Sequence, residues 1–132
     1  MYEIDLEKVW DLPWCIGRMS RDGSYCGIGK LINACGKTED DNNFMNELGK
    51  ILRSHYPNLD IMYDSNYPHA VGYQYHDKPI RNLNTIEEKT QFHQNFTRKL
   101  LEILLKEGFI KLKDSDLAIV KELKQYERVS VC

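Results

Sequence analysis

The sequence has no long hydrophobic run and no basic N-terminal region. It begins MYEIDLEKVW, with acidic residues where a secretory signal peptide carries basic ones. None of its apolar stretches approaches the ~20 residues that a helix needs to cross a bilayer. We therefore expect a cytoplasmic protein without a membrane partner.

Neither sign of charge dominates the chain. It carries 18 Lys and Arg against 20 Asp and Glu, which gives a formal net charge of −2. Basic residues of the C-terminal half, such as Arg98 and Lys99, alternate with acids such as Glu102. Nucleic-acid binding depends on clustered cations and is therefore not expected. The stretch GIGKL also lacks the first glycine and the Ser or Thr of a phosphate-binding loop, so nothing indicates nucleotide hydrolysis.

The cysteines lack the spacing of a metal site. The four cysteines are Cys15, Cys26, Cys35 and Cys132. Because no CxxC or HxxxH pattern occurs, we expect no bound metal and no cofactor. In the reducing compartment expected for this chain, the four side chains are thiols.

Internal repeats, low-complexity stretches and linker-like segments are also absent, so residues 1–132 are expected to form a single globular domain. The hydrophobic content of 42% is that of a folded globular chain. Apolar residues recur mostly at helical spacing, which predicts a mainly helical α+β fold with three to five helices.

The helical pattern occupies several separate segments of the chain. The predicted helices are residues 4–11, residues 26–35 with Gly36 as a cap, the segment from Phe44 to His55 before Pro57, the segment from a TIEE capping box at Thr85 to a stop at Gly108, and DSDLAIVKELKQY near the C-terminus. In addition, FIKLK predicts a short strand and SRDGSY a turn.

Residues 56–84 differ from the rest of the chain because they are rich in proline, tyrosine and histidine. AVGYQY alternates in polarity as strands do, and LDIMY precedes it across the turn DSNYP. A short β-hairpin is therefore predicted around residues 59–76. Long connecting segments often carry function, and tyrosine supplies large contact area at low entropic cost. The candidate ligand-binding residues are Tyr63, Tyr67, His69, Tyr73, Tyr75, His76, Lys78 and Arg81.

This segment predicts a non-catalytic binding protein. One expected ligand is a nucleotide-like small molecule that stacks on a tyrosine and places a phosphate at Lys78 or Arg81. The other is a host protein that contacts the exposed tyrosines. A homodimer interface and simple packing of the aromatic residues across strands are the alternatives.

Cys26 is the candidate nucleophile of the chain. It begins a predicted helix, where a thiol pKa is lowered, and His69 or His76 could activate it further. The words YCGIGKLI and PHAVGYQYHD resemble the cysteine and histidine segments of papain-like peptidases of the bacteriocin-processing type. That resemblance implies a thiol hydrolase or transferase with Cys26 as nucleophile, His69 as base and Asp77 as the residue that orients it. The alternative is that Cys26 is a small buried residue at a tight helix contact.

A second resemblance concerns the words WCIG and CGIGKLINA. They are similar to a family of small bacterial and phage proteins of unknown function that pair Trp-Cys-x-Gly with Cys-x-x-Gly-x-Leu. The resemblance implies a phage or mobile-element origin, and immune evasion by inhibition of host defence is one concrete version of the binding function. It carries no assigned activity, and it favours a packing role for Trp14, Gly17 and Gly29.

Overall fold

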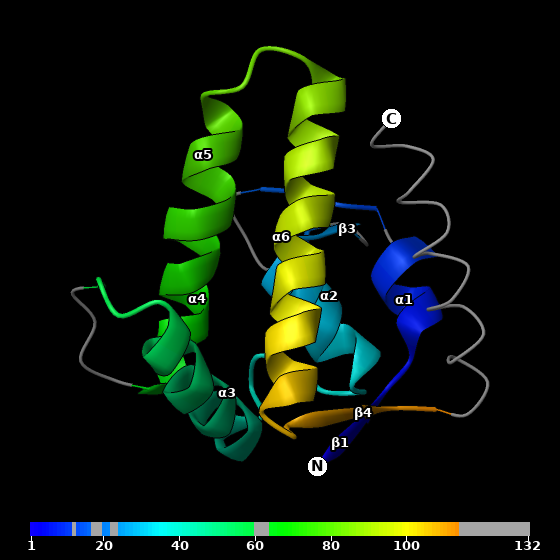
Figure 1. Ribbon diagram of the computed structural model, residues 1–132, viewed down its shortest axis with the longest axis vertical. Coiled ribbons are helices and arrows are strands. Elements are labelled where there is room, and N and C mark those ends of the chain that lie inside the picture. The colour runs from blue at the N-terminus through cyan, green and yellow to red at the C-terminus, as the bar shows by residue number, and fades with distance from the viewer. Residues whose placement is uncertain (12, 17–19, 22–23, 60–63, 114–132) are drawn as a thin grey trace.

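A computed structural model of the chain describes residues 1–11, 13–16, 20–21, 24–59 and 64–113 (Figure 1). The elements in chain order are β1 (Tyr2–Ile4), α1 (Leu6–Asp11), β2 (Ser20–Arg21), β3 (Ser24–Tyr25), α2 (Gly27–Ala34), α3 (Asn42–His55), the 3-10 helix η1 (Asp64–Asn66), α4 (Tyr67–Val71), the π-helix η2 (Gly72–Asp77), α5 (Lys78–Arg81), α6 (Ile86–Lys106) and β4 (Ile110–Leu112). The predicted α+β class, mainly helical, is confirmed. The helix predicted in DSDLAIVKELKQY lies outside the described residues. Within those residues, no helix is both long and apolar enough to span a membrane.

The four predicted helices that fall within the described residues are confirmed as α1, α2, α3 and α6, and local caps account for the start of α6 and the ends of α2 and α6. At the start of α6, the Thr85 hydroxyl accepts a hydrogen bond from the Glu88 N–H at 3.1 Å, as the capping box predicted. Gly36 after α2 and Gly108 after α6 have φ values of 71° and 72°, which glycine adopts without strain. These helix ends could therefore be predicted from single residues of the sequence.

The elements α4, η2 and α5 form one continuous helix that runs antiparallel to α6 (Figure 1). The hairpin predicted around residues 59–76 is therefore wrong, although residues 60–63 of its first strand lie outside the described part. The buried residues Tyr67, Val71, His76 and Ile80 follow one another in steps of four, five and four residues. An α-helix repeats every 3.6 residues, so the wider π-helix accommodates the five-residue step. The five-residue step interrupts the helical period, so the polarity of AVGYQY appears to alternate as it would in a strand.

Two short sheets complete the fold. β1 pairs with β4 in parallel, with Tyr2 opposite Ile110. The rings of Tyr2, Phe44 and Phe109 pack there, with centres between 4.8 and 5.3 Å apart. The strand in FIKLK was predicted, but its partner was not. β2 and β3 pair antiparallel, with Ser20 opposite Tyr25 and Arg21 opposite Ser24. The central residues 22–23 of the turn predicted in SRDGSY lie outside the described residues.

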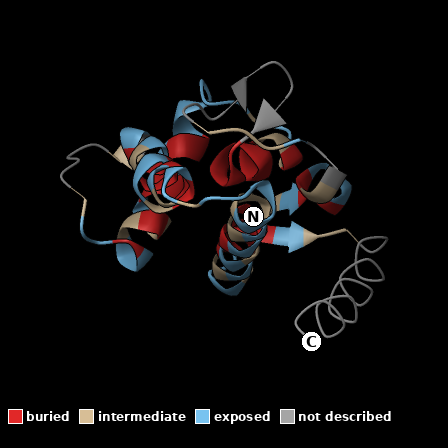
Figure 2. Cartoon of the chain, turned by 90° about the horizontal axis from the view of Figure 1, so that it is seen from above, coloured by how far each residue is buried: buried red, intermediate tan, exposed pale blue. Residues whose placement is uncertain are grey.

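The core lies where α2 packs against α6 and the α4–α5 helix. Figure 2 shows the buried faces of the helices turned toward one another. Gly27 makes the approach of α2 to α6 close, because a Cβ there would stand 2.6 Å from a ring carbon of Phe96 and 2.8 Å from Thr97 Oγ1. α2 also contacts η2, so three helical segments enclose the polar side chains of the candidate site.

Candidate functional site

The predicted ligand-binding residues fall on two sides of the α4–α5 helix, because this segment is a helix and not a strand. The inward side carries Tyr67 and His76, which are both fully buried. Tyr67 donates its hydroxyl hydrogen to the carbonyl oxygen of Tyr56, and the Arg53 guanidinium lies 4.8 Å from its ring centre. Tyr75 is half-buried, with its ring centre 4.7 Å from that of Tyr56. These contacts tie Tyr67 and Tyr75 to the end of α3.

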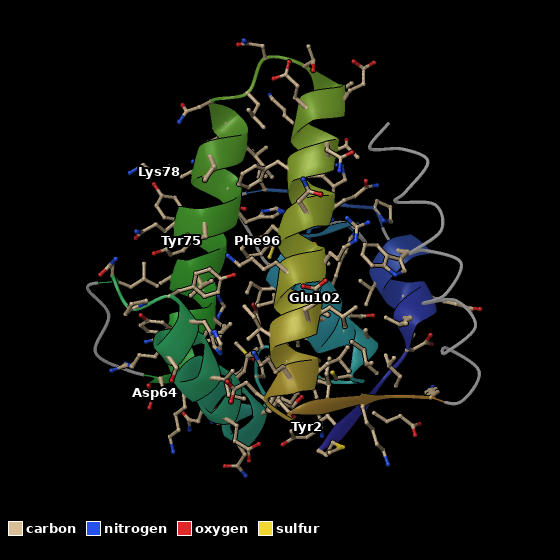
Figure 3. The ribbon with its side chains drawn as sticks, viewed as in Figure 1. Tyr2, Asp64, Tyr75, Lys78, Phe96 and Glu102 are labelled. Atoms are coloured by element: carbon tan, nitrogen blue, oxygen red, sulfur yellow. The ribbon has the colours of Figure 1, made fainter. Side chains whose placement is uncertain are left out.

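The outer face of the same helix consists of His69, Tyr73, Lys78 and Arg81, all exposed. The Tyr73 side chain is 54% exposed, and Figure 3 shows Lys78 pointing away from α6. The helix contains one acidic residue, Asp77, and it is buried. The outer face therefore presents an aromatic ring among basic side chains and has no carboxylate of its own.

Cys26 lies in the core as the N-cap of α2. Its Sγ accepts a hydrogen bond from the Gly29 N–H at 3.3 Å, and the residue is only 2% exposed. Burial, with the charge of Asp77 as a smaller cause, raises the pKa of the thiol to about 12. The predicted base His69 is exposed on α4, and in the described part of the chain no hydrogen bond joins Cys26 to a histidine. These surroundings are those of a small buried residue and not of an activated thiol. Of the other candidates, Tyr63 lies outside the described residues.

Alkylation of Cys26 in the folded protein at pH 7 is expected to be slower than in the unfolded chain by roughly tenfold or more, because only the thiolate reacts. Cys35, which is half-buried and whose pKa burial raises to about 11, provides an internal comparison. Residue-resolved mass spectrometry after labelling with and without denaturant gives both rates. Equal rates for Cys26 in the two states would contradict its burial.

A chain of hydrogen bonds runs through the core between η2 and α6. His76 Nδ1 lies 2.7 Å from Asp77 Oδ1, and His76 Nε2 lies 2.7 Å from His93 Nδ1. We refer to Asp77, His76 and His93 as the polar chain; they are 5%, 0% and 1% exposed. The ring of Phe96, which lies between the two helices in Figure 3, packs 5.2 Å from that of His76. Asp77 and His76 are the last residues of the π-helix, an element that often occurs at functional sites.

The heavy-atom distances of the polar chain fit two arrangements of its protons. The carboxylate of Asp77 can only accept, so His76 Nδ1 donates to it. A neutral His76 accepts at Nε2 from His93 Nδ1, whereas a protonated His76 donates from Nε2 to His93 Nδ1. In both arrangements His93 Nε2 is a buried atom without a hydrogen-bond partner among the described residues. The polar chain therefore ends in a buried ring nitrogen whose hydrogen-bonding capacity is unused.

Trp14 and Lys30 belong to the surroundings of His93. The Trp14 ring stacks on His93 with the ring centres 5.4 Å and the planes 18° apart, and its Nε1 donates to Thr90 Oγ1 at 3.2 Å. The pKa of His93 is lowered to about 2. Burial is the main cause, and the charges of Lys30 and His76 are smaller ones. The ring of His93 is therefore neutral throughout the physiological pH range.

Lys30 is a buried cation close to the polar chain. It is 4% exposed in the middle of α2, and burial lowers the pKa of its ammonium to about 8 despite the opposing influence of Cys15 and Cys26. Neither a hydrogen bond nor an ion pair reaches its Nζ from the residues that the structure describes. Its Nζ is not among the buried side-chain atoms that lack a hydrogen-bond partner.

The sequence interpretation selected His76 and Asp77 but missed Lys30 and His93. His93 lies three residues before Phe96 and seven before Leu100, so it falls on the apolar face of α6. A histidine at such a position departs from the helical pattern and could have been recognised. The contact between His93 and His76 could not be predicted from the sequence, because it depends on how two separate helices pack.

Among the described residues, no group of three or more histidine, cysteine or acidic side chains is close enough to hold a metal ion. Fold and site together define a mainly helical α+β protein with a buried polar chain and an exposed basic and aromatic helix face. In comparisons with known proteins, no family model, no curated protein and no solved structure matches the chain. Its candidate functions are therefore derived from its own geometry.

Proposed function

We propose that the protein is a binding protein that uses the outer face of the α4–α5 helix to contact a partner protein with an acidic surface. The observation that carries this proposal is the composition of that face. Tyr73 is 54% exposed among basic side chains, while Asp77, the acid of the same helix, is buried. Tyrosine and arginine are enriched in protein interfaces, and complementary charge selects the partner and speeds association.

The fold itself makes no visible use of the outer face. Among the described residues, its four side chains make no hydrogen bond, ion pair or ring contact. Some cations elsewhere on the surface are engaged: the ammonium of Lys37 lies 5.6 Å from the ring centre of Tyr2, and the guanidinium of Arg98 lies 5.6 Å from that of Trp10. The outer-face side chains are therefore available to a partner without loss of an internal contact.

A protein partner suits this surface better than a nucleotide-like molecule. The outward side of a helix is convex, whereas small-molecule sites are usually concave. One surface pocket lies beyond α5 and along the first turns of α6, and it is lined by Leu83, Glu87, Glu88, Gln91, Phe92 and Asn95. The charged side chains of that pocket are acidic, which disfavours a phosphate-bearing ligand.

A synthetic acidic peptide of alternating glutamate and leucine serves as the probe for the outer face. On titration, the backbone NMR signals of residues 67–81 are expected to shift, and the affinity is expected to fall as salt screens the exposed charges. The double substitution Lys78→Glu with Arg81→Glu should weaken binding by roughly tenfold or more, because it replaces attraction with repulsion. Tyr73→Ala should also weaken binding, since it removes the exposed ring.

The matched control is Lys50→Glu with Lys106→Glu, which makes the same change in net charge on α3 and at the end of α6. This control is expected to bind the peptide as the wild type does. An equal loss of affinity in the two double variants would contradict a role of the outer face. ATP that shifts residues 67–81 where the peptide does not, or a dimer in sedimentation equilibrium that Tyr73→Ala dissociates, would also overturn the proposal of an acidic protein partner.

A further inference from the structure

The surface pocket at the corner where α5 leads into α6 lies at the top of the molecule in Figure 1. It has a volume of about 520 Å³, is open to solvent, and has a lining that is more apolar than polar. Its apolar residues, Leu83 and Phe92, are half-buried, and its polar residues, Glu87, Glu88, Gln91 and Asn95, are exposed. We refer to these six residues as the corner pocket.

The polar side chains of the corner pocket offer hydrogen-bond acceptors and negative charge. The carboxylates of Glu87 and Glu88 form no ion pair with a described residue. Gln91 Nε2 donates to Asn95 Oδ1 at 3.0 Å, which leaves Gln91 Oε1 as a further acceptor. A ligand that presents positively charged donors is therefore complementary to this rim.

The cations next to the corner pocket on α6 leave this negative charge in place. Arg98 reaches the pocket at Asn95, where its Nη1 lies 3.4 Å from Oδ1, and its guanidinium lies 5.6 Å from the ring centre of Trp10. Asn95 is about two helical turns beyond Glu88. Lys89 follows Glu88 directly, and consecutive residues of a helix do not face each other. The end of the pocket at the first turn of α6 is therefore acidic.

We propose that the corner pocket binds a basic amphipathic segment of a partner protein. A large apolar side chain of the partner lies between Leu83 and Phe92, and its arginine or lysine side chains pair with Glu87 and Glu88. The apolar contact supplies affinity, and the charges select and orient the partner. This surface has the opposite charge to the outer face, and the proposal does not depend on the proposed function of that face.

Other occupants fit the corner pocket less well. Small-molecule sites enclose most of their ligand, whereas this pocket is open to solvent. The carboxylates of Glu87 and Glu88 repel nucleic acid and other anions. Acidic residues in a first turn also stabilise a helix through its dipole, but that role explains neither the half-buried ring of Phe92 beside them nor the hollow that they border.

Two synthetic helical peptides test the corner pocket. One consists of arginine and leucine, and the other has serine in place of each leucine, so that the two carry the same charge. Binding is followed by the backbone NMR signals of residues 83–95 and by calorimetry. The leucine peptide is expected to bind roughly tenfold or more tightly than the serine peptide, because its apolar side chains leave water when they enter the pocket.

The double substitution Glu87→Gln with Glu88→Gln tests the charged rim. It removes both charges but keeps the size of the side chains and the capping box at the start of α6. The affinity for the leucine peptide is expected to fall roughly threefold or more. Glu39→Gln with Glu102→Gln is the matched control, because it makes the same change in net charge at two exposed positions outside the pocket. This control is expected to bind as the wild type does.

Equal affinity of the two peptides would overturn the proposal, because it would show general ionic attraction. Signal shifts centred outside residues 83–95, or an equal loss of affinity in the two double variants, would contradict the corner pocket as the binding site. Argininamide that binds as tightly as the leucine peptide would identify a small organic cation as the ligand and would also overturn the proposal. The acidic peptide is read at residues 67–81 and the basic peptide at residues 83–95, so each proposal can fail alone.

Discussion

Lowering the pH from 7 to 4.5 is expected to reduce the free energy of unfolding by roughly 2–3 kcal/mol, with His93 as the cause. In the unfolded chain the imidazole takes up a proton below its ordinary pKa of 6.5, whereas burial and the charge of Lys30 lower its pKa in the folded protein to about 2. Between these values the unfolded state binds more protons than the folded state, so stability falls as the pH falls. Each pH unit below the unfolded pKa costs about 1.4 kcal/mol.

Urea titrations at closely spaced pH values measure this dependence. In His93→Leu, the slope of unfolding free energy against pH is expected to decrease by about one proton over the same window. Leu100→Ala is the matched control, because it removes a buried side chain from the same helix without removing a titrating group. The control is expected to lower stability and keep the slope. A slope in His93→Leu equal to that of the wild type would show that another group carries the acid sensitivity.

Most helices could be predicted from the sequence because the features that define them are local. α6 shows this best, since Thr85 caps its start, apolar residues recur every three or four positions, and Gly108 ends it. The same local features gave α2 with its cap at Gly36. Local patterns succeeded wherever the helical period was uninterrupted.

The segment around η2 could not be predicted because its period is not regular. One additional residue between Val71 and His76 shifts the buried positions from the usual spacing, and a short window then alternates like a strand. The pairing of Tyr2 with Ile110 could not be predicted from the sequence for a different reason. A parallel pair joins residues that are distant in sequence, and neither strand carries information about its partner.

The candidate site was predicted only in part for the same reason. The sequence singled out the exposed residues Tyr73, Lys78 and Arg81, which remain the outer face when the strand is replaced by a helix. It also selected His76, but as a surface residue. The contact of His76 with His93 joins residues 17 positions apart on two helices, and it exists only because α6 packs against η2.

Replacing Asp77 by alanine is expected to cost about 2–4 kcal/mol of stability, because the substitution leaves a buried donor without its acceptor. His76 Nδ1 would lose its partner at 2.7 Å in a place that is 0% exposed. The effect should propagate along the polar chain, since His76 Nε2 also lies 2.7 Å from His93 Nδ1. Asp77→Asn should cost less than Asp77→Ala, because the carboxamide fills the same volume and can still hydrogen-bond to the imidazole.

Asp64→Ala is the control for Asp77→Ala, because it removes a carboxylate that also forms a close contact. Asp64 Oδ1 lies 2.9 Å from Arg53 Nε, but the side chains of Arg53 and Asp64 are 42% and 28% exposed. Water screens such a pair, so its loss is expected to cost less than about 1 kcal/mol. Thermal and urea unfolding of the three variants beside the wild type measure the difference. If Asp77→Ala costs no more than Asp64→Ala, the hydrogen bonds of the polar chain do not stabilise the core.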